Sequence, residues 1–511
     1  MALNHKILFF VIIIAHLAKT QRYDFVPNSE KSKAVSVSQD TGFSVSPPNT
    51  EYVTYNPPIP KPNSFPDGRI PPIRPTIFYP PDLSFRFSDV GLQRIGRDFI
   101  VSDSIISLSL DNNNISDISP FAFRSMRNLR YLNLSGNKIP RQKLLLLNGN
   151  NNLQTLIIND NSDSDVSNAE FLMEHETFQN LEHLQLCNNQ LRNFRMPFYI
   201  AMHSLSHLHL SNNSISSSSA VFDNIPATLT HLNLNRNLID RVERDKLRYL
   251  QELLMDDNNI IQVCLEDCLE ESISLRGADR MQNLSLSRNQ IVEVSLDAFN
   301  DMKHLLKLDL SGNKIANLAK GTFNKTVFID DLSLAHNILA TIPDVCPMLH
   351  LRSLNLTGNH ISAVLSDTFC RLQRLENLYL SDNTITTIET RAFNLQSLTY
   401  LDLSGNQLKQ LPEQWIFSWQ ILELHLERNN FTELDDLSLI NIKSLRNVYL
   451  HKNPMPKLKA GSFQSLPGHM SLHLNNVRIE CAQCRCNDDD NDRDDDGDDN
   501  NGNSHSDYYE S

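Results

Sequence analysis

Apolar residues recur along most of this chain in a pattern that returns about every 23 or 24 residues. The unit reads L-x-x-L-x-L-x-x-N-x-L, with clear copies at 129–139 and 398–408. Its fourth and sixth positions lie on one face of a short strand, because side chains alternate along an extended chain. A single unit cannot bury these groups, so the pattern predicts stacked coils that share one core.

Seventeen copies follow one another, and their fourth and sixth positions are always apolar. The ninth position is Asn in all copies except the first and last, which we interpret as caps. An Asn amide at a bend can bond backbone groups that the bend leaves unpaired. The ninth positions are Val90, Asn113, Asn137, Asn161, Asn189, Asn213, Asn237, Asn258, Asn289, Asn313, Asn337, Asn359, Asn383, Asn406, Asn429, Asn453 and Val477.

Phenylalanine follows the ninth position by ten residues in several copies, which predicts a second row of core anchors. These residues are Phe123, Phe299, Phe323, Phe369, Phe393 and Phe463. With this pattern the chain resembles the extracellular leucine-rich-repeat family with 24-residue units, which includes Toll-type ectodomains and neuronal or matrix proteins. The resemblance implies an α/β solenoid, a leucine-rich-repeat horseshoe with a parallel concave β-sheet and with loops and short helical turns outside. The usual cysteine cluster before the first repeat is missing here.

Four segments follow from these patterns. Residues 1–20 resemble a signal peptide, because Lys6 precedes an apolar run that is too short to span a bilayer. Residues 21–81 form a proline-rich arm that we expect to be disordered, a spacer or a partner-docking segment. Residues 82–486 are the solenoid with a short cysteine cap. No later run is long enough to cross a membrane, so we expect a secreted, extracellular protein.

The net charge of −14 is concentrated in the last segment. Residues 487–511 hold ten Asp, one Glu and one Arg, so the rest of the chain is nearly balanced. There is no basic surface for nucleic acid. We expect an acidic disordered tail. Weak calcium binding stays open, since Asp492–Gly497 is similar to half of a calcium loop whose twelfth position is Asn503.

Positions 3 and 5 of each strand project from the predicted concave face. Two groups of side chains there are candidates for binding. The preferred docking surface is aromatic and consists of Tyr379, Tyr400, His425, Tyr449 and His473. The alternative is that these are ordinary exposed aromatic residues of the strands. The second group is a ladder of His183, His207, His209 and His231, which could bind a metal or respond to pH, or simply be a solvated polar column.

Seven Asn-x-Ser/Thr triplets are candidates for glycosylation, although an Asn-rich repeat also produces such triplets by chance. They begin at Asn114, Asn133, Asn212, Asn283, Asn324, Asn355 and Asn430. Three of them, Asn133, Asn283 and Asn355, fall on concave positions. Sugar there would obstruct the centre and the N-terminal part of that face.

Eight cysteines are present. Cys346 and Cys370 occupy equivalent positions in adjacent repeats, which predicts a disulfide. Cys264 and Cys268 are expected to pair within a long insertion that we expect to bulge from the solenoid as a loop. The remaining cysteines are Cys187, Cys481, Cys484 and Cys486. Cys187 is too far from the other three to pair with them, and those three can form only one disulfide among themselves. Two thiols therefore remain, either free or in a disulfide-linked oligomer.

No P-loop, G-x-S-x-G or H-E-x-x-H motif occurs in the chain. We therefore expect that the protein is not an enzyme and that it holds no cofactor and no metal centre. The expected function is binding of an extracellular protein or glycan ligand, in cell recognition or innate immune sensing. The alternative is a structural organiser of the extracellular matrix.

Overall fold

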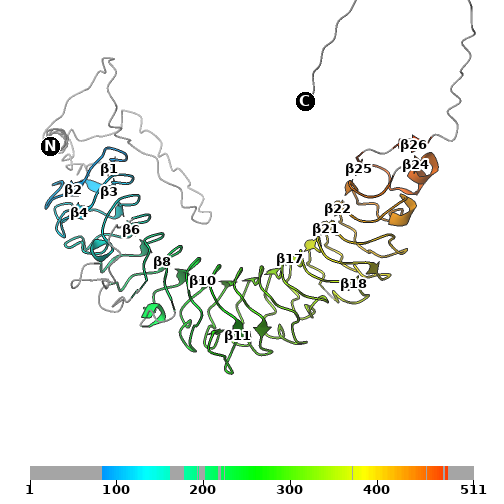
Figure 1. Cartoon of the computed structure of the whole chain (residues 1–511), viewed down its shortest axis with the longest axis horizontal. Coiled ribbons are helices and arrows are strands. Elements are labelled where there is room, and N and C mark those ends of the chain that lie inside the picture. The colour runs from blue at the N-terminus through cyan, green and yellow to red at the C-terminus, as the bar shows by residue number, and fades with distance from the viewer. Residues whose placement is uncertain are drawn as a thin grey trace, which may run out of the picture.

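The computed structural model describes residues 83–480 apart from 162–177, 193, 195–201, 217–219, 224, 371, 456 and 476–477. The predicted signal peptide, proline-rich arm and acidic tail lie outside these residues, as do the three cap cysteines. The described chain winds into an arc, with one row of strands along its inner, concave side (Figure 1). The horseshoe that the family resemblance implied is confirmed.

Each of the 17 repeats contributes one strand to a single parallel sheet, whose strands pair in the order of the repeats. Each strand spans only a few residues before the chain bends away. The strands are β1 (Leu83–Arg86), β3 (Ile105–Ser109), β5 (Tyr131–Asn133), β6 (Thr155–Ile157), β7 (His183–Gln185), β8 (His207–His209), β9 (His231–Asn233), β10 (Glu252–Leu254), β13 (Asn283–Ser285), β15 (Lys307–Asp309), β16 (Asp331–Ser333), β17 (Ser353–Asn355), β19 (Asn377–Tyr379), β21 (Tyr400–Asp402), β22 (Glu423–His425), β23 (Asn447–Tyr449) and β25 (Ser471–His473).

The outer, return side is built from turns, very short parallel strands and 3₁₀ helices, and no α-helix occurs in the described ranges. The helical turns expected outside are therefore few and tight. The strands are β2 (Arg94–Ile95), β4 (Asp117–Ile118), β11 (Gln262–Cys264), β12 (Ser272–Ser274), β14 (Glu293–Val294), β18 (Ala363–Val364), β20 (Thr387–Ile388), β24 (Lys457–Lys459) and β26 (Arg478–Glu480). The 3₁₀ helices are η1 (Arg141–Lys143), η2 (Ala220–Phe222), η3 (Asp435–Leu437) and η4 (Ala460–Ser465).

An asparagine ladder closes the bend after each concave strand. Oδ1 of Asn313 accepts the backbone N–H of Ile291 in the preceding coil at 3.1 Å. Its Nδ2 donates to the carbonyl of Leu286 in that coil at 3.0 Å and to Leu310 in its own coil at 2.9 Å. Most other ninth-position asparagines repeat this arrangement. The ladder therefore joins neighbouring coils through side chains where the sheet ends.

Phenylalanines form a second row of packing along the return side. The rings of Phe299 and Phe323 stack at 5.7 Å, as do those of Phe369 and Phe393. Trp415 continues the row, edge-on to Phe393, and is fully buried. The expectation is wrong for Phe463, which is 40% exposed. It lies in η4, and the next coil is described only as far as β26, which pairs with β24 ahead of Phe463.

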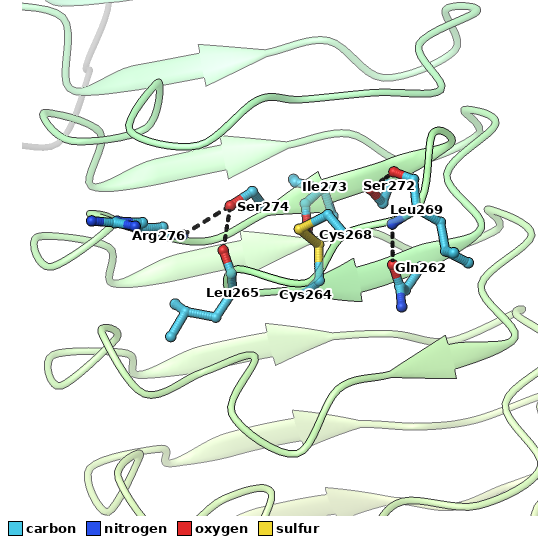
Figure 2. The surroundings of a disulfide bond; sticks show 9 residues. All are labelled: Gln262, Cys264, Leu265, Cys268, Leu269, Ser272, Ile273, Ser274 and Arg276. Carbon is cyan, nitrogen blue, oxygen red and sulfur yellow. Dashed lines mark hydrogen bonds between the residues drawn. A yellow bond between two sulfur atoms is a disulfide. The ribbon is translucent and has the colours of Figure 1, made fainter.

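The insertion that holds Cys264 and Cys268 was expected to bulge as a loop, and this is only partly correct. Residues 266–271 are exposed, but the chain then forms β12, which pairs with β11 and contacts Val242 of the previous repeat through Ile273. Figure 2 shows the connection between β11 and β12, with the disulfide and a hydrogen bond from Leu269 N to Gln262 Oε1 at 2.8 Å.

This extra strand changes the shape of the solenoid. It adds one layer to the return side between two repeats, while β9, β10 and β13 remain direct neighbours on the concave side. An extra layer lengthens the outer side by about 4.8 Å, the spacing of paired strands. The arc therefore bends more sharply at this repeat.

Candidate functional site

The concave sheet presents two side chains per strand to solvent. In nearly every concave strand from β5 to β23 the middle residue is buried, and the residues on either side of it are partly exposed. These partly exposed residues are positions 3 and 5 of the repeat. Because the strands are in register, side chains at one position form columns across the sheet.

The five aromatic residues from Tyr379 to His473 that the sequence singled out lie together as one aromatic column. Tyr379 and Tyr400 have ring centroids 5.2 Å apart, and Tyr400 lies 5.1 Å from His425. His425, Tyr449 and His473 then stack nearly parallel at 4.3 Å and 4.4 Å. The column crosses strands β19 to β25.

Carboxylates surround this column, and they shift the pKa values of its members. Partial burial raises the pKa of Tyr400 to about 12, and the nearby charge of Asp402 adds to the shift. Partial burial disfavours the charged form of His425, but its Nδ1 lies 3.0 Å from Glu427 Oε1, and that hydrogen bond helps to raise the pKa of His425. His425 therefore keeps its proton to higher pH than a free imidazole.

Sequence reasoning missed position 7 of the repeat. Glu427 and His451 occupy this position, just past the strand, and the bend returns their side chains to the concave surface. His451 Nε2 lies 3.6 Å from Glu427 Oε1, and its ring lies 6.0 Å from that of Tyr449. The signal that could have found them is the repeat register itself, extended by two residues beyond each strand.

The histidine ladder also forms as a packed group. The rings of His183 and His207 lie 4.3 Å apart, and those of His207 and His231 stack at 4.1 Å. Burial lowers the pKa of His207 to about 4, with repulsion from the neighbouring histidines adding to the shift. His209, at position 5 of the same strand, also has a lowered pKa because of burial.

Within the described part of the chain, no group of three or more His, Cys, Asp or Glu side chains is arranged to hold a metal ion. The histidine ladder lies within this part of the chain and forms no such group. A surface hollow of about 470 Å³, which Arg94 and Lys143 help to line, lies on the return side, away from both columns.

Two disulfides occur among the described cysteines, Cys264–Cys268 and Cys346–Cys370, each with Cα atoms 5.5 Å apart. The second joins two adjacent coils. Cys187 is a free, partly exposed thiol at position 7 after β7.

The glycosylation triplets fall into two groups. Asn133, Asn283 and Asn355 are half-buried on concave strands, and Asn283 donates to Glu252 Oε2 at 3.1 Å. The other four are exposed outside the strands, and these are Asn114, Asn212, Asn324 and Asn430. The aromatic column therefore has no triplet on its own strands.

Comparison with known proteins agrees with this geometry. The family described as Leucine rich repeat matches residues 91–139, 103–162, 279–339 and 349–408. Mimecan of Gallus gallus is 27% identical over 161 residues, which cover 31% of this chain and 46% of that protein. Podocan-like protein 1 of Homo sapiens is 31% identical over 207 residues, 39% of each chain. The chain thus spans less than half the length of these two relatives.

Among solved structures, a leucine-rich-repeat protein of Leptospira interrogans has a TM-score of 0.56 at 22% identity, covering 73% of this chain and 91% of that one. This likeness concerns the fold alone. Together with the repeat, the parallel sheet and the asparagine ladder, these findings show that the chain has the leucine-rich-repeat fold. No helix among the described residues has the length and apolar character needed to cross a membrane.

Proposed function

We propose that this chain is a secreted protein that binds an extracellular protein or glycan through its concave face, for cell recognition or innate immune sensing. The observation that carries the proposal is the aromatic column, five adjoining rings on the exposed face of a rigid sheet. Aromatic side chains supply large contact areas with little loss of conformational entropy and are enriched at binding hot spots. Secretion is supported by the apolar leader at 7–15 and by the resemblance to extracellular repeat proteins.

A structural role in the extracellular matrix is the second candidate. It is supported by the similarity to Mimecan and Podocan-like protein 1, which are secreted leucine-rich-repeat proteoglycans of the matrix. Saturable binding of the secreted chain to cultured cells would favour recognition. Salt-sensitive retention in an insoluble matrix fraction would favour the structural role.

The column is tested by Tyr400→Ala and Tyr449→Ala in the full secreted chain. Each should weaken binding to cells by about tenfold or more, the scale of a hot-spot residue, with little change in melting temperature. Phe417→Ala is the matched control, because Phe417 is a half-exposed aromatic on the return side. Unchanged binding in both tyrosine variants would move the site to the histidine ladder, the convex side or the arm.

A further inference from the structure

The concave surface of the last five repeats carries charge of one sign. We name positions 3, 5 and 7 of the repeats of β19, β21, β22, β23 and β25 the acidic aromatic face. These positions hold the aromatic column and three carboxylates, Asp402, Glu423 and Glu427, but no Lys or Arg. A ligand on this face therefore meets a negative potential.

Glu427 is paired with His425 and His451, whereas the charges of Asp402 and Glu423 are uncompensated in the described part of the chain. Among the described residues, neither Asp402 nor Glu423 forms an ion pair with Lys or Arg. Arg428, which directly follows Glu427 in the sequence, is at position 8 of its repeat and pairs instead with Asp382 at 3.0 Å. Oε2 of Glu427 is buried and has no hydrogen-bond partner among the described residues. Asp402 and Glu423, both partly exposed, are therefore the carboxylates that N–H donors of a ligand can reach.

The stacked rings of the aromatic column present their polar edges to a ligand, and their faces are covered by neighbouring rings. His425, Tyr449 and His473 lie within 11° of parallel, so they cover one another and turn their edges to solvent. Tyrosine hydroxyls and carboxylates on such an edge accept hydrogen bonds. Lys offers three N–H donors and Arg five, with no acceptor on either, so they are the complementary side chains. A sulfated glycan would be repelled.

We propose that the acidic aromatic face binds a Lys- and Arg-rich segment of a partner protein. This inference rests on the proposed function and specifies its partner. Four strand spacings of about 4.8 Å separate β19 from β25, so an extended peptide of about six residues crosses the face. The segment lies across the strands, with its cationic side chains between the carboxylates.

The test uses the full secreted chain and a fluorescent decalysine peptide that carries a photo-crosslinker. The double variant Glu423→Gln/Glu427→Gln should weaken peptide binding by about tenfold or more, and wild-type binding should weaken as salt is raised. The control Glu293→Gln/Glu413→Gln removes two exposed glutamates from the return side and should leave affinity unchanged. The single variant Glu423→Gln guards against misfolding of the double variant, because Glu423 forms no ion pair among the described residues.

Crosslinked peptides are mapped by mass spectrometry, because the tail at 487–511 is also acidic. Crosslinks within 377–475 support the proposal. Crosslinks confined to the tail, or equal affinity in the Glu423→Gln/Glu427→Gln and control variants, overturn it. Tighter binding of heparin than of decalysine at this face also overturns it. If cell binding still depends on Tyr449 while decalysine does not bind the face, this inference fails and the proposed function stands.

Discussion

Replacement of Asn313 by Ala tests how the solenoid holds its coils together. Asn313 is 6% exposed and bonds two neighbouring coils. Its two main acceptor carbonyls each have a second partner, since Asn289 also donates to Leu286 and Asn337 also donates to Leu310. The substitution therefore leaves both carbonyls with one hydrogen bond.

The backbone N–H of Ile291 is different, because it donates to the Asn313 side chain and the site is buried. One buried donor left unpaired costs about 1–3 kcal/mol. We expect the free energy of unfolding to fall by about this amount. A larger loss would require both carbonyls to be orphaned as well, which the shared bonding prevents.

Urea unfolding followed by circular dichroism measures this loss, in protein produced without N-linked glycans. Asn430→Ala is the matched control, because this residue is exposed and adjoins the buried Asn429. It should cost less than about 0.5 kcal/mol, as is usual for surface substitutions. Equal losses in the two variants would refute the ladder and the repeat register.

Two further predictions concern the histidine ladder and the disulfide. The folded pKa of His207 is lowered from 6.5 to about 4, so wild-type stability should fall as pH drops through that window, because the unfolded chain takes up the proton first. His207→Gln should reduce this fall by about 1 kcal/mol, a modest value because solvent screens the partly exposed ring, as measured by urea unfolding at several pH values. Cys346→Ser opens a bridge with a sequence separation of 24 and should cost about 2–4 kcal/mol of unfolding free energy; an unchanged melt would contradict this.

The repeat register is readable from sequence because it is a local rule. Alternation along a strand places Tyr400 and Tyr449 on the exposed face. The spacing of the repeats places their strands close together in the sheet, so that both residues belong to the aromatic column. The same register places Cys346 and Cys370 in adjacent coils. These inferences need only the period of the chain and the geometry of a parallel sheet.

Three features depend on contacts that a local pattern does not contain. Strand β12 forms backbone hydrogen bonds with Val242 of another repeat, and the sequence of the insertion alone does not show this partner. Glu427 lies beyond the end of its strand, where the direction of its side chain depends on the conformation of the bend and not on strand alternation. Phe463 matches the spacing of the buried phenylalanines, but burial requires a following coil to cover it.

Binding through the concave face is tested most directly by placing a glycan on it. Asp402→Asn creates an Asn-Leu-Ser triplet beside Tyr400, and Gln396→Thr creates a triplet at the exposed Asn394 outside the strands. Asp402→Gln removes the same charge without adding sugar. In saturable binding of the secreted chain to cells, the account predicts that glycosylated Asp402→Asn loses binding well beyond Asp402→Gln, while glycosylated Gln396→Thr binds like wild type. Full binding by glycosylated Asp402→Asn would contradict it.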